Sequence, residues 1–219
     1  MLTTVRFVTI GQTPRTDMVP DLVALLPGGT RVLEAGALDG LDAPGIAAMA
    51  PASGEARLVT RLADGSQAVV GKAKMHARLQ RLLDGLGPDP STATVLVCTG
   101  EFPGLRGPGV FLDAQHLVDH GVAAICAGMA TIGLLLPAAE QAGEFHWKPG
   151  PGQELRATWA SPYAGDRFDE AARELSGCDV IVMHCMGFTE DQRRRVAAGS
   201  GRPVLLARRF VSAAVAQLL

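Results

Sequence analysis

Short apolar runs rich in β-branched residues alternate along the chain with segments in which apolar residues recur every three to four positions. The first pattern is typical of buried strands, and the second is typical of amphipathic helices. We expect strands at residues 5–10, 31–35, 57–63, 66–71, 94–97, 122–127, 155–160, 180–184 and 204–207. We expect helices within residues 17–26, 38–50, 73–86, 114–120, 131–143, 166–176, 190–198 and 211–219. This alternation predicts an α/β fold in which helices cover both faces of parallel sheets.

One pair of strands should be antiparallel. Asp64-Gly65 separates residues 57–63 from residues 66–71, and Asp-Gly between two strands predicts a tight hairpin because the turn needs a positive φ. The other strands should lie parallel, and parallel sheets bind ligands beyond the carboxyl ends of their strands. The residues that follow predicted strands at such ends are Gly11, Cys98, Gly128 and Cys185.

A weak repeat links the two halves of the chain. Residues 94–102 resemble residues 180–188, because in both a buried strand is followed by a cysteine, one residue and a glycine. The repeat predicts two similar parallel-sheet α/β lobes with pseudo-twofold symmetry, a cleft between them and one thiol from each. We expect an N-terminal lobe of residues 1–113 plus 207–219 and a C-terminal lobe of residues 114–206. Chance similarity between buried strands is the alternative to duplication.

Cys98 and Cys185 are the strongest candidates for chemistry. Each follows a predicted buried strand and precedes a glycine turn, whose backbone N–H groups would favour the thiolate. Two such thiols on opposite sides of one carbon could remove a proton and return it to the other face, which is racemisation without a cofactor. The alternative is a thiol that serves as a small apolar core residue. We prefer that interpretation for Cys126, inside a predicted strand, and for Cys178, just before one.

Two loops are candidates for binding a carboxylate. After the first strand, Gln12 and Thr13 could donate hydrogen bonds, and Arg15 could hold a carboxylate with two parallel hydrogen bonds. Before residues 131–143, backbone N–H groups could bind an anion at a helix N-terminus. The alternatives are a solvent-facing arginine and an ordinary helix entry. The residues that we include from the two loops are Gly11, Gln12, Thr13, Arg15, Met129, Ala130 and Thr131.

Several single residues could complete a site. Glu101 could orient a substrate amine or act as a second base, or it could be an ordinary solvated carboxylate. Tyr163 could line a pocket or pack against a turn, and Arg208 could reach an anion, as could Arg209. We expect His184 to be a satisfied core or interface residue, because neighbours in a strand point to opposite faces and it cannot pair with Cys185. The residues added to the substrate-binding set are Thr99, Gly100, Glu101, Tyr163, Met186, Gly187 and Arg208.

Composition excludes several classes of function. Lys and Arg number 20 against 22 Asp and Glu, and they are scattered, while aromatic residues make up only 5%, so we expect no nucleic-acid partner. No apolar run approaches the ~20 residues that span a bilayer, and no export signal is evident, so we expect a cytoplasmic protein with reduced cysteines and no membrane partner. Cys-x-x-Cys spacing, nucleotide loops and His-Glu-x-x-His are absent, so we expect no metal and no cofactor.

Seven motifs, taken together and in order, resemble the AroM family over nearly the whole chain. They are Thr9-Ile-Gly-Gln-Thr-Pro-Arg15, Glu34-Ala-Gly-Ala-Leu-Asp-Gly40, Val59-Thr-Arg-Leu-Ala-Asp-Gly65, Cys98-Thr-Gly-Glu-Phe-Pro103, Ala160-Ser-Pro-Tyr163, Cys185-Met-Gly-Phe188 and Pro203-Val-Leu-Leu-Ala-Arg208. AroM proteins are in turn distantly similar to the aspartate/glutamate racemase superfamily, which includes cofactor-independent racemases, maleate isomerases and arylmalonate decarboxylases. The resemblance implies that Cys98 and Cys185 match the two catalytic thiols of that superfamily.

The resemblance also implies that residues 11–15 and 128–131 match its carboxylate-binding regions. We therefore expect a cofactor-independent racemase or isomerase that acts on a small carboxylate by proton transfer between the two cysteines. A single-cysteine isomerase or decarboxylase and a non-catalytic anion-binding protein of the same fold are the alternatives. The sequence does not fix the oligomeric state, for which a homodimer is one candidate.

Overall fold

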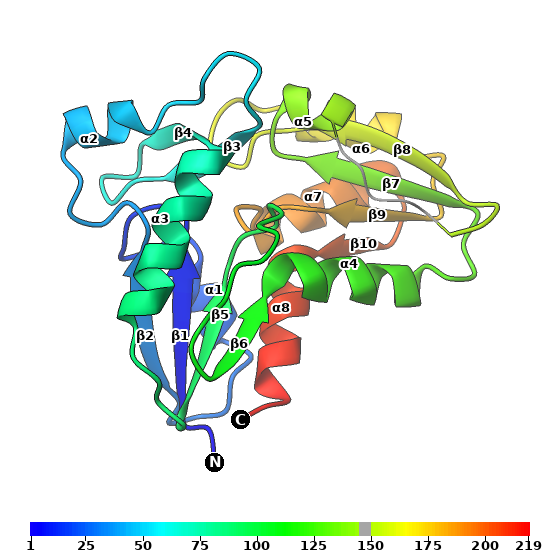
Figure 1. Ribbon diagram of the computed structural model, residues 1–219. Coiled ribbons are helices and arrows are strands. Elements are labelled where there is room, and N and C mark those ends of the chain that lie inside the picture. The colour runs from blue at the N-terminus through cyan, green and yellow to red at the C-terminus, as the bar shows by residue number, and fades with distance from the viewer. Residues whose placement is uncertain (145–149) are drawn as a thin grey trace. The chain divides into compact units, whose positions relative to one another are not determined.

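Two four-stranded parallel sheets, each in its own unit of the chain, form the framework of the protein. The computed structural model describes residues 1–144 and 150–219. One unit comprises Met1–Gln115 with Ala213–Leu219, and the other comprises His116–Ser212 (Figure 1). The predicted α/β class with two similar parallel-sheet lobes is confirmed. Among the described residues, no helix has the length and apolar character needed to cross a bilayer.

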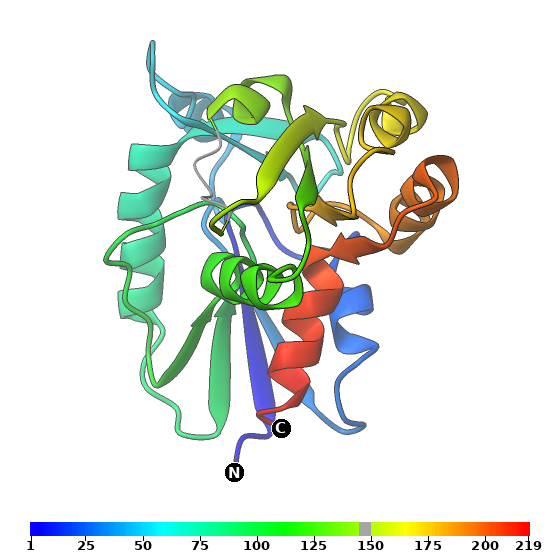
Figure 2. The ribbon, with the colours of Figure 1, turned by 90° about the vertical axis from the view of Figure 1, so that its right-hand side faces the viewer.

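The first unit has a sheet in the order β2-β1-β5-β6, with every neighbouring pair parallel. In Figure 2, helices α1 and α3 lie on opposite faces of this sheet. The predicted hairpin is confirmed, since β3 and β4 pair antiparallel across Asp64-Gly65. The elements are β1 (Thr4–Thr9), α1 (Val19–Val23), β2 (Arg31–Gly36), α2 (Ala43–Ala48), β3 (Arg57–Arg61), β4 (Gln67–Gly71), α3 (Lys72–Gly85), β5 (Thr92–Leu96) and β6 (Val110–Asp113).

The second unit has a parallel sheet in the order β10-β9-β7-β8. Helices α6 and α7 pack together on one face of it (Figure 2). The elements are α4 (Ala114–Ile125), β7 (Thr131–Leu136), α5 (Ala139–Glu144), β8 (Glu154–Trp159), α6 (Phe168–Glu174), β9 (Val180–Met183), α7 (Glu190–Ser200), β10 (Val204–Leu206) and α8 (Ala207–Ala216).

The two sheets repeat one strand order. In each unit the first strand in the chain lies between the second and the third, and the fourth lies beyond the third. β1, β2, β5 and β6 therefore correspond to β7, β8, β9 and β10. The β3–β4 hairpin breaks the repeat, because the segment between β8 and β9 holds a single helix, α6.

Two predicted elements were wrong. Residues 122–127 were expected to form a strand, but helix α4 continues to Ile125. Val118, Val122 and Cys126 are all buried at a spacing of four residues, which is the spacing of one helix face. Residues 131–143 were expected to form a helix, but Thr131–Leu136 is the buried strand β7. Its run of leucines favours a helix in isolation, and burial on both faces of the sheet overrides that preference.

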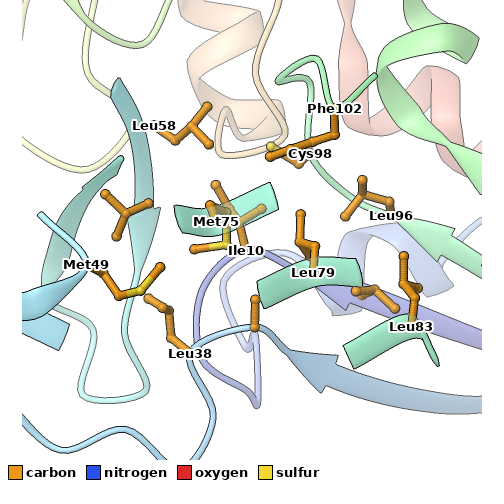
Figure 3. Close-up of a cluster of buried hydrophobic side chains, with 13 residues drawn as sticks. Ile10, Leu38, Met49, Leu58, Met75, Leu79, Leu83, Leu96, Cys98 and Phe102 are labelled. Carbon is orange, nitrogen blue, oxygen red and sulfur yellow. The ribbon is translucent and has the colours of Figure 1, made fainter. Parts of the chain in front are cut away.

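The core of the first unit lies between the sheet and α3. Met75, Leu79 and Leu83 of α3 are buried at helical spacing against Ile10 and Leu96 from the ends of two strands (Figure 3). The same cluster extends to Leu58 of the hairpin and to Cys98 and Phe102. The core therefore reaches the carboxyl end of the sheet, where the first candidate thiol lies.

Candidate active site

Two short turns of the same construction carry the candidate thiols. Cys98 lies two residues beyond β5, and Cys185 lies two residues beyond the corresponding strand β9. In each turn the backbone N–H of the second residue after the cysteine donates to its sulfur, from Gly100 to Cys98 Sγ and from Gly187 to Cys185 Sγ, both at 3.3 Å. We call residues 98–100 and 185–187 the thiol turns. The repeat predicted from the sequence is confirmed at this point.

The four cysteines divide by environment. Cys98 is 8% exposed, at the border of the apolar cluster beside Leu58 and Phe102 (Figure 3), and Cys185 is half-buried. Cys126 and Cys178 are fully buried, and burial raises the pKa of both thiols. Their predicted role as core residues is confirmed, because a buried neutral thiol is a poor nucleophile.

A neighbouring side chain comes close to the glycine of each thiol turn. A Cβ on Gly100 would lie 2.8 Å from Leu58 Cδ2. A Cβ on Gly187 would overlap the hydroxyl of Tyr163 and lie 2.7 Å from its Cζ and 2.9 Å from Pro162 Cγ. Of the two roles considered for Tyr163, the structure therefore places it against the second thiol turn.

A buried arginine donates hydrogen bonds to the backbone of the second thiol turn. Arg208 is 1% exposed, and its Nε and Nη2 donate to Met186 O at 3.1 and 2.8 Å. Nη2 also donates to Gly187 O at 3.1 Å. Arg208 Nε and Nη2 therefore bind carbonyl oxygens of the turn, and the contact of Arg208 with a substrate anion stays a prediction.

His184 is buried and satisfied, as predicted. Its side chain is 4% exposed, and Nε2 lies 3.1 Å from Asp119 Oδ1. This contact ties β9 to helix α4 within the second unit, so the histidine joins two elements of one core.

The loop that follows β1, residues 11–15, contacts the β3–β4 hairpin, and we call it the Gly11 loop. Gly11 N–H donates to Thr9 Oγ1, and a Cβ on Gly11 would overlap Arg61 O and lie 2.6 Å from Thr60 Oγ1. Gln12 N–H donates to Arg61 O at 3.2 Å. The β3–β4 hairpin therefore lies at the carboxyl end of the first sheet, beside β1 (Figure 1).

The side chain of Gln12 forms hydrogen bonds with three backbone groups. Its Nε2 donates to Leu38 O and Leu41 O at 3.3 and 3.2 Å, and its Oε1 accepts from Ala63 N–H at 3.1 Å. The amide thus joins the loop to the turn after β2 and to the hairpin. Both amide donors of Gln12 are therefore used within the protein, and its direct role in carboxylate binding stays a prediction.

Thr13 binds a carboxylate of the protein itself. Its N–H and Oγ1 donate to the two oxygens of Asp39 at 2.7 and 2.8 Å, and Gly36 N–H donates to the same group. Thr13 was correctly predicted to bind a carboxylate, but this carboxylate belongs to Asp39 of the same chain. The Asp39-Gly40 pair in the sequence indicated a turn at this place.

Arg15 likewise forms its two parallel hydrogen bonds inside the protein. It is 4% exposed, and its Nε and Nη2 donate to the two oxygens of Asp17 at 2.8 and 2.9 Å. Nη1 donates to Thr9 Oγ1, and its backbone N–H donates to Glu34 Oε2. Burial raises the pKa of Asp17, but the hydrogen bonds and charge of Arg15 outweigh it and the pKa is lowered. A substrate carboxylate would have to displace this pair.

The second predicted loop lies at the wrong end of its sheet. Met129 and Ala130 precede β7, whereas Cys185 follows β9, which runs parallel to β7. The N–H groups of Ala130 and Thr131 already donate to Asp179 Oδ2 at 2.7 and 2.9 Å. These donors lower the pKa of Asp179, so it remains charged. Met129, Ala130 and Thr131 thus lie at the opposite end of this sheet from Cys185.

Glu101 is a solvent-exposed carboxylate in the structure, which is the simpler of the interpretations given above. Its side chain is 63% exposed, and Oε2 lies 3.9 Å from Lys72 Nζ. Thr99, at the centre of the first thiol turn, is half-buried. Within residues 1–144 and 150–219, no group of three or more His, Cys, Asp or Glu side chains could hold a metal ion.

Comparison with known proteins places this geometry in context. A family model described as AroM protein matches residues 5–219. No curated protein sequence matched the chain. Maleate cis-trans isomerase from Nocardia farcinica bound to TRIS is similar in structure, with a TM-score of 0.56 at 15% identity, over 99% of this chain and 92% of that chain.

Two further structures have the same fold. A cysteine-to-serine mutant of the Nocardia farcinica enzyme, which carries a covalently bound succinylcysteine intermediate, has a TM-score of 0.53 at 14% identity, over 99% of this chain and 92% of that one. The maleate isomerase Iso from Pseudomonas putida S16 has a TM-score of 0.54 at 12% identity, over 100% and 93% of the two chains. At these identities the likeness establishes a racemase/isomerase-like fold.

Proposed function

The chain belongs to the AroM family, and on this basis we propose that it is a racemase or isomerase that acts on a small carboxylate through Cys98 and Cys185. One cysteine, as the thiolate, takes a proton from the carbon beside a carbonyl or carboxyl group. The C–H bond breaks, an S–H bond forms, and the electron pair moves toward the carbonyl oxygen. The other thiol gives its proton to the opposite face of that carbon.

The pair of matched thiol turns carries this proposal. Each sulfur lies beyond the carboxyl end of the third strand of its unit, which is where parallel α/β sheets bind ligands. Each receives an N–H hydrogen bond at 3.3 Å from its own turn, and such a donor favours the thiolate over the thiol. A thiol that exchanges readily between its two forms serves equally as base and acid, so no bound cofactor is required.

Direct contacts with the substrate are assigned to the thiol turns themselves. Thr99 and Gly100 belong to the first turn, and Met186 and Gly187 belong to the second, beside Tyr163. The Gly11 loop is assigned the role of supporting the site, because Gln12 and Arg15 donate hydrogen bonds to other groups of the protein.

Deuterium incorporation tests the proposal. The protein is incubated in D₂O with a panel of single-enantiomer amino acids and 2-hydroxy acids, and loss of the α-proton is followed by NMR. Cys98→Ser and Cys185→Ser should each abolish exchange. Cys126→Ser and Cys178→Ser are the matched controls and should retain it wherever the variant folds. Undiminished exchange in both thiol-turn variants would rule out the two-thiol mechanism.

A second candidate is cis–trans isomerisation of an alkene diacid by one thiolate. The succinylcysteine held by the mutant Nocardia farcinica enzyme favours it, since a cysteine of this fold forms a bond to a four-carbon diacid there. In this reaction the thiolate adds to one alkene carbon, so that an S–C bond forms as the C=C π bond breaks, and the other carbon takes a proton from water to give the succinyl adduct. Rotation about the new C–C single bond follows, and loss of that proton with cleavage of the S–C bond restores the alkene and the thiolate. Incubation with maleate distinguishes the candidates: fumarate, together with a succinyl adduct on one thiol-turn cysteine, supports this second reaction.

A further inference from the structure

The β3–β4 hairpin is an addition to the repeated strand order, and it carries a side chain to the first thiol turn. Leu58 Cδ2 lies 2.8 Å from the position that a Cβ on Gly100 would occupy. Cys98 Sγ lies 3.4 Å from that same position, and Phe102 Cε2 lies 3.6 Å from it. Leu58 and the thiol of Cys98 therefore meet beside the backbone of Gly100, within one buried cluster (Figure 3).

Strand β3 crosses the carboxyl ends of two neighbouring strands of the first sheet. Leu58 and Thr60 are the buried residues of β3, and alternate residues of a strand share one face. Thr60 Oγ1 lies 2.6 Å from the position of a Cβ on Gly11, which follows β1, whereas Leu58 contacts Gly100, beyond β5. β1 and β5 are paired in parallel. The buried face of β3 thus lies where parallel sheets bind ligands.

The backbone of the hairpin is held at the end that carries Leu58. Val70 lies opposite Leu58 in the register and is fully buried. The next residue, Gly71, donates its N–H to Met49 O at 2.8 Å. The carboxylate of Glu55 accepts two backbone N–H groups beside this end, at 2.8 and 2.9 Å. A molecule that approaches the sulfur of Cys98 therefore meets Leu58 on a strand that is fixed to its surroundings.

We propose that Leu58 is a specificity-determining residue, which limits the group that a substrate can place beside Cys98 to about the size of a methyl group. This inference deepens the proposed function and rests on it for its catalytic meaning. The carbon that exchanges its proton must reach the sulfur of Cys98, so a substituent on that carbon comes close to Leu58. The substrate class is then a small carboxylate whose α-carbon bears a hydrogen and a methyl-sized group.

Two alkylating reagents that differ by one methyl group measure this limit without a substrate. The full-length protein is treated separately with iodoacetamide and with 2-iodopropanamide, whose extra methyl is on the reacting carbon, and mass mapping gives the rates at Cys98 and Cys185. The ratio of the two rates at one cysteine, divided by the same ratio for glutathione, is the size selection. Both reagents react with the thiolate, so the thiol pKa cancels in this ratio.

The unaltered protein should disfavour the larger reagent at Cys98 at least about tenfold beyond glutathione, because one methylene in an apolar site is discriminated by about 10–200-fold. Leu58→Ala should reduce the size selection at Cys98 about tenfold and leave that at Cys185 unchanged. Leu58→Phe should increase it. Leu79→Ala is the matched control, since it removes the same carbon atoms from the same cluster, on helix α3.

Three results would overturn the inference. They are a size selection at Cys98 equal to that of glutathione in the unaltered protein, an unchanged selection in folded Leu58→Ala, and an equal change in Leu79→Ala. If Leu58→Ala does not fold, Leu58→Val and Leu58→Phe decide, because they should move the selection in opposite directions. Absence of deuterium exchange with every substrate tested would refute the proposed racemase activity and leave this measurement unaffected.

Discussion

Substitution of Gly187 by alanine tests whether the second thiol turn depends on the close approach of Tyr163. The new methyl group would overlap the Tyr163 hydroxyl and lie 2.7 Å from Cζ and 2.9 Å from Pro162 Cγ. Carbon atoms attract one another best at about 3.5–4.0 Å, so either the tyrosine or the turn must move by about 1 Å. Movement of the turn would carry Gly187 N–H away from Cys185 Sγ.

The expected magnitude follows from two opposing effects. Overpacking of a well-packed site costs about 1–3 kcal/mol. The backbone of Gly187 lies outside the positive-φ region, so alanine gains about 0.4–1 kcal/mol by restricting the unfolded chain. The two ranges leave a net loss in the free energy of unfolding of at most about 2.6 kcal/mol, with a middle value of about 1.3 kcal/mol. Gly100→Ala should cost less, because only the mobile Cδ2 methyl of Leu58 stands in the way.

A double-mutant cycle in urea measures this contact. Gly187→Ala is compared in the native background and in Tyr163→Ala, where the ring is gone but Pro162 remains. We expect the cost of Gly187→Ala to fall by about 1 kcal/mol in the second background, which is a normal coupling energy for residues in contact. Equal costs in both backgrounds would refute the argument, and the alkylation rate at Cys185 in Gly187→Ala shows whether the turn or the tyrosine moves.

Three further predictions follow from other parts of the molecule. Gln12→Ala should lower the free energy of unfolding by about 1–3 kcal/mol in urea, because three backbone groups lose their partner; an unchanged value would contradict the bracing role. Hydrogen bonds from Ser91 and Thr92 lower the pKa of Asp89 from 3.8 to about 2. The folded-state pKa is the lower one, so its stabilisation is complete above about pH 4 and is lost as the pH falls toward 2; Asp89→Asn should flatten the acid side of the stability profile. Asp179→Ala should lower the Tm while leaving alkylation of Cys185 unchanged, since Asp179 binds the turn before β7; altered alkylation would contradict that placement.

The sequence was most informative where local pattern and tertiary environment agree. The Asp64-Gly65 hairpin was predicted because the turn chemistry and the flanking alternation point the same way. The strands before Cys98 and Cys185 were predicted because short β-branched runs in an α/β chain are buried on both faces. The matched position of the two thiols followed from these strands.

Residues 110–136 show where such agreement fails. β6 was not predicted, because residues 110–113 form a short strand at the sheet edge that is paired on one side only. The two errors that followed, at residues 122–127 and 131–143, exchanged a helix and a strand of similar apolar content. Periodicity does not separate a buried strand from a buried helix segment, and here burial by the neighbouring strands decided.

The binding residues were harder to predict for a different reason. Gln12, Thr13 and Arg15 have the chemistry that binds carboxylates, and in the structure Thr13 and Arg15 do bind them, from Asp39 and Asp17. Residue type reports which group a side chain can hold, but it does not report whether the protein or a ligand supplies that group. The polar groups of a loop at a strand end are usually paired within the protein. A buried donor without a partner lowers stability by more than a typical hydrogen bond raises it.

Duplication of a strand order explains why the two thiol turns are alike, and it also identifies what makes them different. A repeat copies backbone geometry, and both turns have the same N–H to sulfur hydrogen bond. The surroundings of the two turns differ, because the Cδ2 methyl of Leu58 lies against the first turn and the buried Arg208 donates to the carbonyl oxygens of the second. In a duplicated fold of this kind, the broken symmetry is more informative about mechanism than the preserved symmetry.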